Sequence, residues 1–226
     1  MMGAARCGAL LLAVALMGQM PVDPQIALLQ YATALLKAQP PANVTFVYSV
    51  EQSGSRNIEE VHRVYRSGSR KRDETLSVDG IAYKQPRVRV VTEPDRYELG
   101  KLAPTQPAYT FTFSGMHDVE GARVYVFRTD IQSAGSFAVT SVAIDATHFL
   151  PREIRFSSAR GAAKGMGRIV FGPEGRYWMP REASVQVRDA AGKISREKIT
   201  WSKYGFPESL PSSTFLAPQA PPTPAP

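Results

Sequence analysis

The chain from residue 143 to residue 215 is a succession of strand-like segments with no helix between them. It contains AIDATHFLPREIRF, then GRIVFGPEGRYWMPREASVQV, then GKISREKITWSKYGFPESLPSSTF, with Asp, Gly or Pro at the breaks. Side chains on a strand alternate between two faces, so each of these segments presents one apolar face. The succession therefore predicts an antiparallel sheet that keeps returning on itself and has to bury one face.

Similar segments occupy most of the chain before residue 143. Strands are predicted over 43–50, in NIEEVHRVYRSG, in SRKRDETLSVDG with its Asp-Gly turn, in RVRVVTEP, in YTFTFSG and in RVYVFRT. RVYVFRT is apolar on both faces, which is typical of a strand that is covered on both sides. We expect a mainly β protein with about ten or eleven strands and one substantial helix.

That helix is predicted over residues 23–38, DPQIALLQYATALLKA. Asp23 is expected to cap its N-terminus, Pro24 lies in its first turn, and the prolines at 40–41 end it. The apolar residues near one helical face are Ile26, Leu29, Leu35 and Leu36. We expect this face to pack on the sheet or to plug it.

The segment EPDRYELGKLAPTQPAY, residues 93–109, interrupts the strand pattern. Its prolines at 94, 104 and 107 are too closely spaced for a regular strand. We interpret it as a connection or lid that crosses one mouth of the sheet, with a short helical turn near Leu99 to Leu102. Loops of this length are commonly functional.

The two ends of the chain differ in composition from the rest. Residues 1–20 carry Arg6 and then an apolar run too short to cross a bilayer, which predicts a secretory signal peptide, although a buried first helix is the alternative. Residues 216–226 are rich in Pro and Ala and predict a disordered tail. We expect one domain over residues 21–215 and a periplasmic or secreted location.

The formal net charge is +7. Such a surplus favours acidic partners, including the head groups of an anionic membrane surface, and export disfavours nucleic acid as a partner. The basic residues concentrate in one predicted hairpin: Arg63, Arg66, Arg70, Lys71 and Arg72. We expect them to form a solvated edge, because charges on edge strands prevent sheet-to-sheet aggregation.

Residues for catalysis or metal binding are sparse. The single cysteine, Cys7, lies within the predicted signal, so the mature chain is expected to have no disulfide and no thiolate site. Of the histidines, His117 lies near acidic residues but at an ordinary turn. His148 is expected in a solvated turn, and His62 is expected among charges on an edge strand. No G-x-S-x-G elbow or P-loop is present. We predict a protein that is not an enzyme and uses no cofactor or metal.

A sheet with this many strands curls until it closes into a barrel or half barrel, and so creates an interior. Beyond about eight strands that interior is wider than its own side chains fill, so it needs a helical plug, a ligand or both. The candidate lipid-binding residues on the apolar strand faces are Phe46, Tyr48, Tyr109, Phe111, Phe113, Tyr125, Phe127, Phe137, Phe156 and Trp201, and Ile154, Ile169 and Phe171 share these faces. We expect most of them to be core.

Several segments resemble the LolA-type periplasmic lipoprotein carriers and their LolB and LppX-type relatives. The segments are VYVFRTD, SVAIDATHFLPREIRFSSARG, MPREASVQVRDAAGK and KITWSKYGFPESLPSSTF. The motif positions within them are Asp145, Leu150 with Pro151, Pro180, and Pro211 with Phe215. The resemblance spans roughly residues 24 to 215.

The resemblance implies an unclosed β-barrel with a helix over its mouth and a hydrophobic concavity for acyl chains. It also implies non-enzymatic binding and transport of lipids or lipoprotein acyl chains by a monomer in the cell envelope. Relatives with this architecture include sensing domains, so an envelope sensor that binds a protein segment in its groove is the alternative.

Overall fold

A computed structural model describes residues 22–54, 56–93, 97–133 and 135–216 of the chain. Its helices are α1 (Pro24–Lys37), α2 (Leu99–Leu102) and the 3-10 helix η1 (Ser212–Phe215). Its strands are β1 (Asn43–Ser53), β2 (Ile58–Ser67), β3 (Arg70–Val78), β4 (Ile81–Thr92), β5 (Tyr109–Val119), β6 (Ala122–Ile131), β7 (Phe137–Asp145), β8 (Pro151–Arg160), β9 (Ala163–Glu174), β10 (Tyr177–Arg188) and β11 (Ile194–Gly205).

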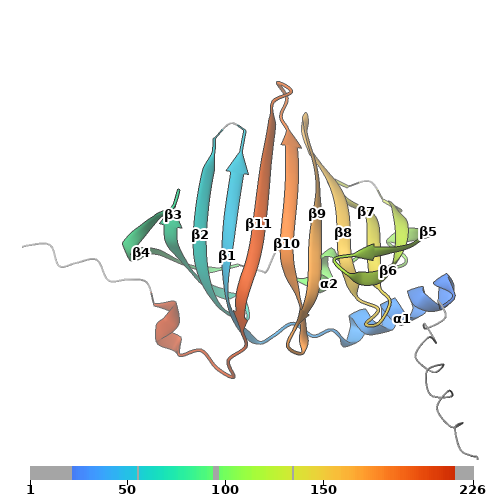
Figure 1. The fold of residues 1–226 in the computed structure, drawn as a ribbon, viewed down its shortest axis with the longest axis horizontal. Coiled ribbons are helices and arrows are strands. Elements are labelled where there is room, and N and C mark those ends of the chain that lie inside the picture. The colour runs from blue at the N-terminus through green and yellow to red at the C-terminus, as the bar shows by residue number, and fades with distance from the viewer. Residues whose placement is uncertain (1–21, 55, 94–96, 134, 217–226) are drawn as a thin grey trace, which may run out of the picture.

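The strands form one antiparallel sheet of 11 strands in the order β4-β3-β2-β1-β11-β10-β9-β8-β7-β6-β5 (Figure 1). Strands β4 and β5 are its two edges and are not paired with each other, so the barrel is open. Pairing of β1 with β11 joins the first and last strands at the centre of the sheet. The predicted mainly β fold, an unclosed barrel of about ten or eleven strands with a helix against it, is confirmed.

Tight turns connect the strands where the sequence predicted them. At the β3–β4 turn, Asp79 and Gly80 both have positive φ angles, 51° and 77°. Glu120 and Gly121 repeat this geometry between β5 and β6, with φ angles of 48° and 74°. Two successive residues with positive φ match the twist of the paired strands, as in a type I′ hairpin.

Helix α1 begins and ends close to its predicted limits. The Asp23 carboxylate accepts a hydrogen bond of 2.8 Å from the Gln25 amide, and Pro24 opens the first turn, where its missing N–H costs nothing. The helix ends at Lys37, before the prolines at 40–41. The capping prediction for Asp23 is confirmed.

The prediction of which face of α1 packs on the sheet is wrong for most of its residues. Ile26, Leu29 and Leu36 are 49%, 69% and 82% exposed, and of the predicted set only Leu35 packs against the core. The buried residues are Ala27 and Tyr31. Alanine lets the helix backbone approach the sheet closely, and α1 has apolar residues on both sides, so periodicity alone could not distinguish the two.

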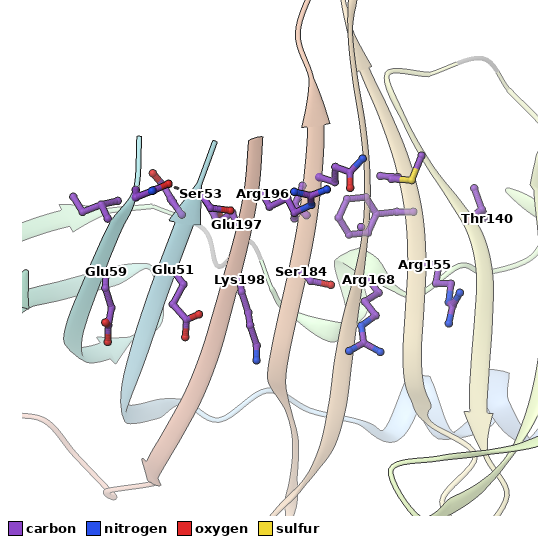
Figure 2. A pocket seen from close by; sticks show the side chains of 18 of the residues that line it. Glu51, Ser53, Glu59, Thr140, Arg155, Arg168, Ser184, Arg196, Glu197 and Lys198 are labelled. Carbon is purple, nitrogen blue, oxygen red and sulfur yellow. Dashed lines mark hydrogen bonds between the residues drawn. The ribbon is translucent and has the colours of Figure 1, made fainter. Parts of the chain in front are cut away.

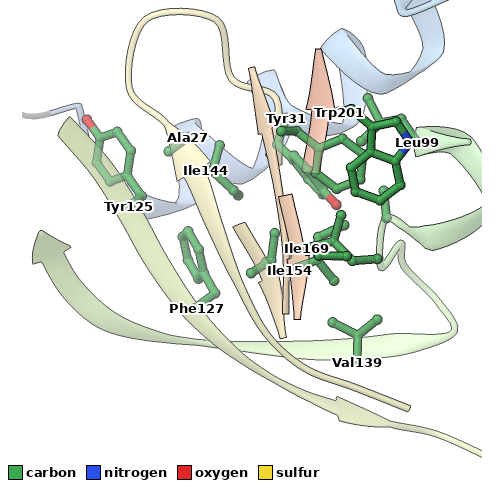
Figure 3. Close-up of a cluster of buried hydrophobic side chains, with 14 of the residues drawn as sticks. Ala27, Tyr31, Leu99, Tyr125, Phe127, Val139, Ile144, Ile154, Ile169 and Trp201 are labelled. Carbon is green, nitrogen blue, oxygen red and sulfur yellow. The ribbon is translucent and has the colours of Figure 1, made fainter. Parts of the chain in front are cut away.

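The hydrophobic core lies between α1, α2 and the face of the sheet that they cover (Figure 3). Its members include Tyr125 and Phe127 from β6, which are 2% and 1% exposed, and Trp201 from β11. Val124, which alternates with Tyr125 along β6, is also buried. The prediction that β6 is covered on both faces therefore holds only at Val124, because Val126 on the same face is partly exposed and Arg128 is exposed.

The segment between β4 and β5 closes one side of this core. It forms α2 over Leu99–Leu102, as predicted, and buries Leu99 and Ala103. The Tyr97 ring meets the Trp201 ring edge-on at 4.8 Å between centroids. In addition, the buried Tyr31 hydroxyl of α1 donates a hydrogen bond of 2.7 Å to the Pro104 carbonyl. The two helical segments are thus tied to each other and to the sheet.

The predicted signal peptide, residues 1–20, and nearly all of the predicted tail, residues 216–226, lie outside the described residues. The domain boundary at residue 21 therefore stays a prediction. Within the described ranges, no helix is both long and apolar enough to cross a membrane.

Replacing Phe127 by Ala should test the importance of this core. The ring is almost fully buried, so its loss removes apolar contacts and leaves a cavity beneath α1. We expect the free energy of unfolding to fall by about 3–5 kcal/mol in a denaturant titration. Ile81→Ala, at a position 72% exposed on β4, is the control and should change it by less than about 0.5 kcal/mol. Equal effects of the two substitutions would contradict this description of the core.

Candidate functional site

A cavity of about 940 Å³ opens beside the C-terminal end of α1. We call it the mouth pocket; its walls are the end of α1 and the segment that follows it, the α2 segment, and the turns at the ends of β7 and β9. This volume lies within the range of about 300–1,000 Å³ that is usual for small-molecule sites.

One side of the mouth pocket is apolar. Its apolar lining residues are Val44, Leu99, Leu150, Trp178, Met179 and Pro180. Leu99 also belongs to the core, and Leu150 and Trp178 pack against the core. The Trp178 indole N–H donates a hydrogen bond of 2.7 Å to the Pro151 carbonyl, which satisfies its one polar group and fixes the ring in the wall. The pocket is therefore an extension of the core toward solvent.

Charged residues border the same pocket. Lys37, Arg66, Lys101 and Arg176 contribute cationic groups, and Glu98 contributes an acidic one. Lys101 pairs with Glu98 at 2.6 Å between Nζ and Oε2, and the buried Arg66 donates a hydrogen bond of 3.1 Å to the Glu93 carbonyl. An apolar wall with a mainly basic border suits an amphipathic ligand that carries a negative charge.

The aromatic residues that the sequence predicted as lipid-binding lie elsewhere. Tyr125, Phe127 and Trp201 are core residues. Phe46, Tyr48, Tyr109, Phe111 and Phe156 are partly buried and pack against the core. Phe113 and Phe137 are 42% and 38% exposed. None of these described residues lines the mouth pocket.

The residues of the mouth pocket were not predicted as binding residues, although the sequence held a signal for some of them. Leu150 and Pro180 are motif positions of the family resemblance, and Leu99 belongs to the predicted lid. His148 also lines the pocket and, as predicted, lies in a solvent-exposed turn. Its imidazole is 3.0 Å from the Asp145 carboxylate. No signal in the sequence brought Val44 of β1 to these residues.

A second hollow, of about 990 Å³, lies on the sheet face opposite the helices (Figure 2). Glu51, Lys198, Ser184, Arg168 and Arg155 follow one another across β1, β11, β10, β9 and β8 in this hollow. The cations among them are engaged by acids of the same face. Arg168 contacts Glu153 at 3.3 Å and Glu182 at 2.8 Å.

The same acids bind the neighbouring cations. Arg155 pairs with Glu153 at 2.6 Å and Lys198 with Glu182 at 3.4 Å. Burial by itself would lower the pKa of Arg168, but its hydrogen bonds and charge interactions with Glu182 and Glu153 outweigh burial and raise it. This hollow therefore combines paired charges with apolar lining from Ile58, Phe156, Met166 and Val185, and Phe156 is a predicted lipid-binding residue that lines it.

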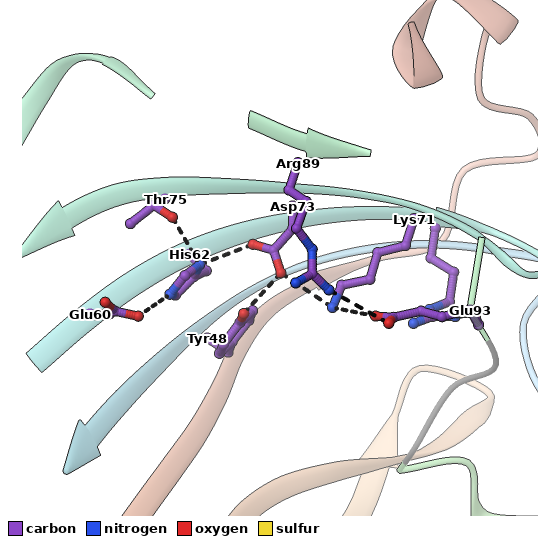
Figure 4. A network of polar contacts seen from close by, with 9 residues as sticks. Tyr48, Glu60, His62, Lys71, Asp73, Thr75, Arg89 and Glu93 are labelled. Carbon is purple, nitrogen blue, oxygen red and sulfur yellow. Dashed lines mark hydrogen bonds and ion pairs between the residues drawn. The ribbon is translucent and has the colours of Figure 1, made fainter. Parts of the chain in front are cut away.

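A polar network lies on the helix-facing side of β1, β2 and β3 (Figure 4). The Tyr48 hydroxyl donates to Asp73 at 2.9 Å, and His62 contacts Asp73 through Nδ1 at 3.0 Å and Glu60 through Nε2 at 3.2 Å. The Tyr48 and His62 rings are stacked at 4.6 Å. Lys71 adds an ion pair to Asp73 at 3.2 Å.

These contacts change how the groups titrate. Burial by itself would lower the pKa of His62, but Asp73 and Glu60 outweigh burial and raise it above 6.5. Burial by itself would raise the pKa of Asp73, but His62, Lys71 and Tyr48 hold it below 3.8. Burial, with Asp73 and Glu60, raises the pKa of Tyr48. The network therefore favours the ion pair between His62 and Asp73.

The expectation that the basic β2–β3 hairpin is a solvated edge is wrong for part of it. The edge strand is β4, while β2 and β3 lie inside the sheet. Arg66 and His62 are buried, and the Lys71 side chain is only 15% exposed. The sequence could not show this, because the charges that neutralise the hairpin come partly from Glu93, after the next strand.

Among the described residues, no group of three or more His, Cys, Asp or Glu side chains is arranged to hold a metal ion. At the His62 network, the Lys71 ammonium lies 3.2 Å from the Asp73 carboxylate and adds a positive charge there.

Comparisons with known proteins give structural relatives only. No family model matches the chain, and no curated protein matches it. Solved structures that resemble it include a LolA superfamily protein from Nitrosomonas europaea, with 13% identity, a TM-score of 0.43, and coverage of 87% of this chain and 98% of that one. A domain described as an outer membrane lipoprotein-sorting protein from Vibrio parahaemolyticus has 12% identity, a TM-score of 0.46, and coverage of 85% and 97%.

A DUF1329 family protein from Desulfovibrio piger also resembles the chain, with 10% identity, a TM-score of 0.47, and coverage of 86% of this chain and 98% of that one. The description of the Nitrosomonas europaea structure names the LolA superfamily, to which the sequence segments were compared above.

The His62 network predicts a definite dependence of stability on pH. His62, with its raised pKa, adds stability that is fully present below its unfolded pKa of about 6.5 and is lost as the pH rises through the folded-state pKa. Asp73, with its lowered pKa, adds stability above about pH 3.9 that is lost as the pH falls through its folded-state pKa. Both contributions are present between about pH 4 and 6.5.

In the wild type we expect the free energy of unfolding to fall as the pH rises above about 6.5. In His62→Gln this fall should be absent, because glutamine does not titrate. Asp73→Asn removes the main anion beside the imidazole, so it should lower the pKa of His62 in an NMR titration. An unchanged imidazole pKa in that variant would show that the network does not control His62.

Proposed function

We propose that the protein binds acyl chains of lipids or lipoproteins in the mouth pocket and carries them in the cell envelope, without catalysing a reaction. The observation that supports this most directly is the pocket itself, a cavity of about 940 Å³ with one apolar side that extends the core and a mainly basic border. Each methylene buried there contributes about 0.8 kcal/mol, so an acyl chain has a large driving force to enter.

The apolar concave face offers further room if α2 moves. Leu99 and Ala103 of this segment belong to the same buried cluster as Trp201. The Tyr97 ring against Trp201 and the hydrogen bond from Tyr31 to Pro104 are two of its contacts. An acyl chain that displaced the α2 segment would replace its apolar contacts with its own. The aromatic residues predicted from the sequence would then line the deeper part of the site.

A second candidate is a sensor or interaction module that binds a protein segment in the same pocket. The polar groups of Glu98, His148 and Arg176 in the lining favour it, because a peptide backbone could use them as hydrogen-bonding partners. Mass spectrometry of the gently purified protein separates the two candidates. A retained lipid supports the carrier, and a retained peptide supports the module.

Leu150→Asp tests the mouth pocket as the acyl site. A carboxylate in the apolar wall would lose its water when a chain binds, so the affinity for a fluorescent fatty acid should fall about tenfold or more. Ile81→Asp, at an exposed position of β4, adds the same charge away from the pocket and should bind as the wild type does. Equal affinities of the two variants would place the acyl site elsewhere.

Tyr31→Phe tests whether the α2 segment is a barrier to entry. The change removes the buried hydrogen bond to Pro104 and should cost the closed arrangement about 1 kcal/mol, which corresponds to about fivefold faster association in stopped-flow experiments. Thr129→Val removes a comparable buried hydrogen bond of β6, to the Val139 carbonyl at 2.8 Å, and is the control. If both variants associate at the wild-type rate, the segment does not limit entry.

A further inference from the structure

Helix α1 has an exposed aliphatic stripe that the core does not use. Ile26, Leu29 and Leu36 are mostly exposed, and they lie on the side of the helix away from the buried Ala27 and Tyr31. A helix that is apolar on both sides is typically covered on both sides. In the described structure the sheet covers only one of them.

The charge distribution of α1 is suited to contact with an apolar phase that has a polar boundary. The helix has no acidic residue, and its single charged residue is Lys37 in the last turn. Lys37 lies one residue after Leu36, at the border of the mouth pocket. A lysine at this position can keep its ammonium group at the polar boundary while the aliphatic stripe enters an apolar phase.

Across the mouth pocket from Lys37, the β9–β10 turn adds aromatic and basic groups. Figure 1 shows this turn at the same end of the molecule as α1, and Lys37 and Arg176 line the same pocket. The Arg176 guanidinium lies over the Tyr177 ring at 5.0 Å, and Tyr177 contacts the Phe206 ring at 4.6 Å. Amphipathic rings and long basic side chains are the groups that concentrate at membrane–water interfaces.

We propose that the aliphatic stripe of α1, with Lys37 and the Arg176–Tyr177 pair, is a docking surface for an anionic lipid bilayer. The stripe enters the interfacial region, and the two cations meet the head groups. The net charge of +7 adds long-range attraction to such a surface. A second copy of the chain is the competing cover, and the experiment below distinguishes it from a bilayer.

Docking on a bilayer is separate from acyl binding, and its test uses no fatty-acid ligand. Wild type and variants are produced from the full chain, and the N-terminus of each is identified by mass spectrometry so that all share it. Flotation is measured with vesicles of phosphatidylcholine, alone and mixed with phosphatidylglycerol. We expect the wild type to float with the mixed vesicles and to be released by salt. The double variant L29Q/L36Q should partition about tenfold more weakly, because two exposed aliphatic groups no longer enter the bilayer.

The matched control is I81Q/M166Q, which removes two equally exposed apolar side chains from β4 and β9. We expect it to float as the wild type does. R176Q should bind the mixed vesicles more weakly and with less dependence on salt, because one cation no longer meets the head groups.

Three outcomes would overturn the proposal. The first is equal flotation of L29Q/L36Q and the wild type. The second is equal flotation of the wild type on neutral and anionic vesicles, which removes the role of the cations. The third is a wild-type dimer in sedimentation experiments that L29Q/L36Q abolishes while neither protein floats, which assigns the stripe to a second copy of the chain. None of these outcomes depends on the fatty-acid measurements, so the two proposals fail separately.

Discussion

The need to cover one face of an open, curled sheet governs the rest of this structure. Eleven strands present more apolar surface on one face than the sheet can hide by curling, and its two edge strands do not meet. Helices α1 and α2 supply the cover. They are joined by the hydrogen bond from Tyr31 to Pro104, and each packs against residues of the sheet. The position of these two segments decides how much of the interior is accessible.

The covered face has two parts with different chemistry. From β5 to β11 it is apolar and lies under the helices, whereas across β2 and β3 it carries the network of His62, Asp73 and Lys71. Tyr48 of β1 stands at the boundary, with its ring packed against the core and its hydroxyl bonded to Asp73. Satisfying the polar groups within the sheet lets a charged region adjoin an apolar one without an unpaired charge.

The mouth pocket forms where this cover ends. The last turn of α1, the α2 segment and the β9–β10 turn meet there without filling the space, so the apolar wall reaches solvent beside basic side chains. The same end of the molecule presents the exposed stripe of α1. Acyl binding and bilayer contact, as proposed, would use adjoining surfaces, because Lys37 and Arg176 belong to both.

The sequence by itself determined the local structure. The alternation of apolar and polar residues determined the strands. Asp79–Gly80 determined a hairpin turn, and Asp23 with Pro24 determined the start of α1. Each of these features depends on residues that are neighbours in the chain. Only the tertiary structure decided which side of α1 is buried, since Ala27 and Leu29 are both apolar. It also decided that His62 lies inside the sheet, and that Val44, Leu99 and Trp178 share a pocket. Those outcomes depend on contacts between segments far apart in the chain, which periodicity and spacing do not specify.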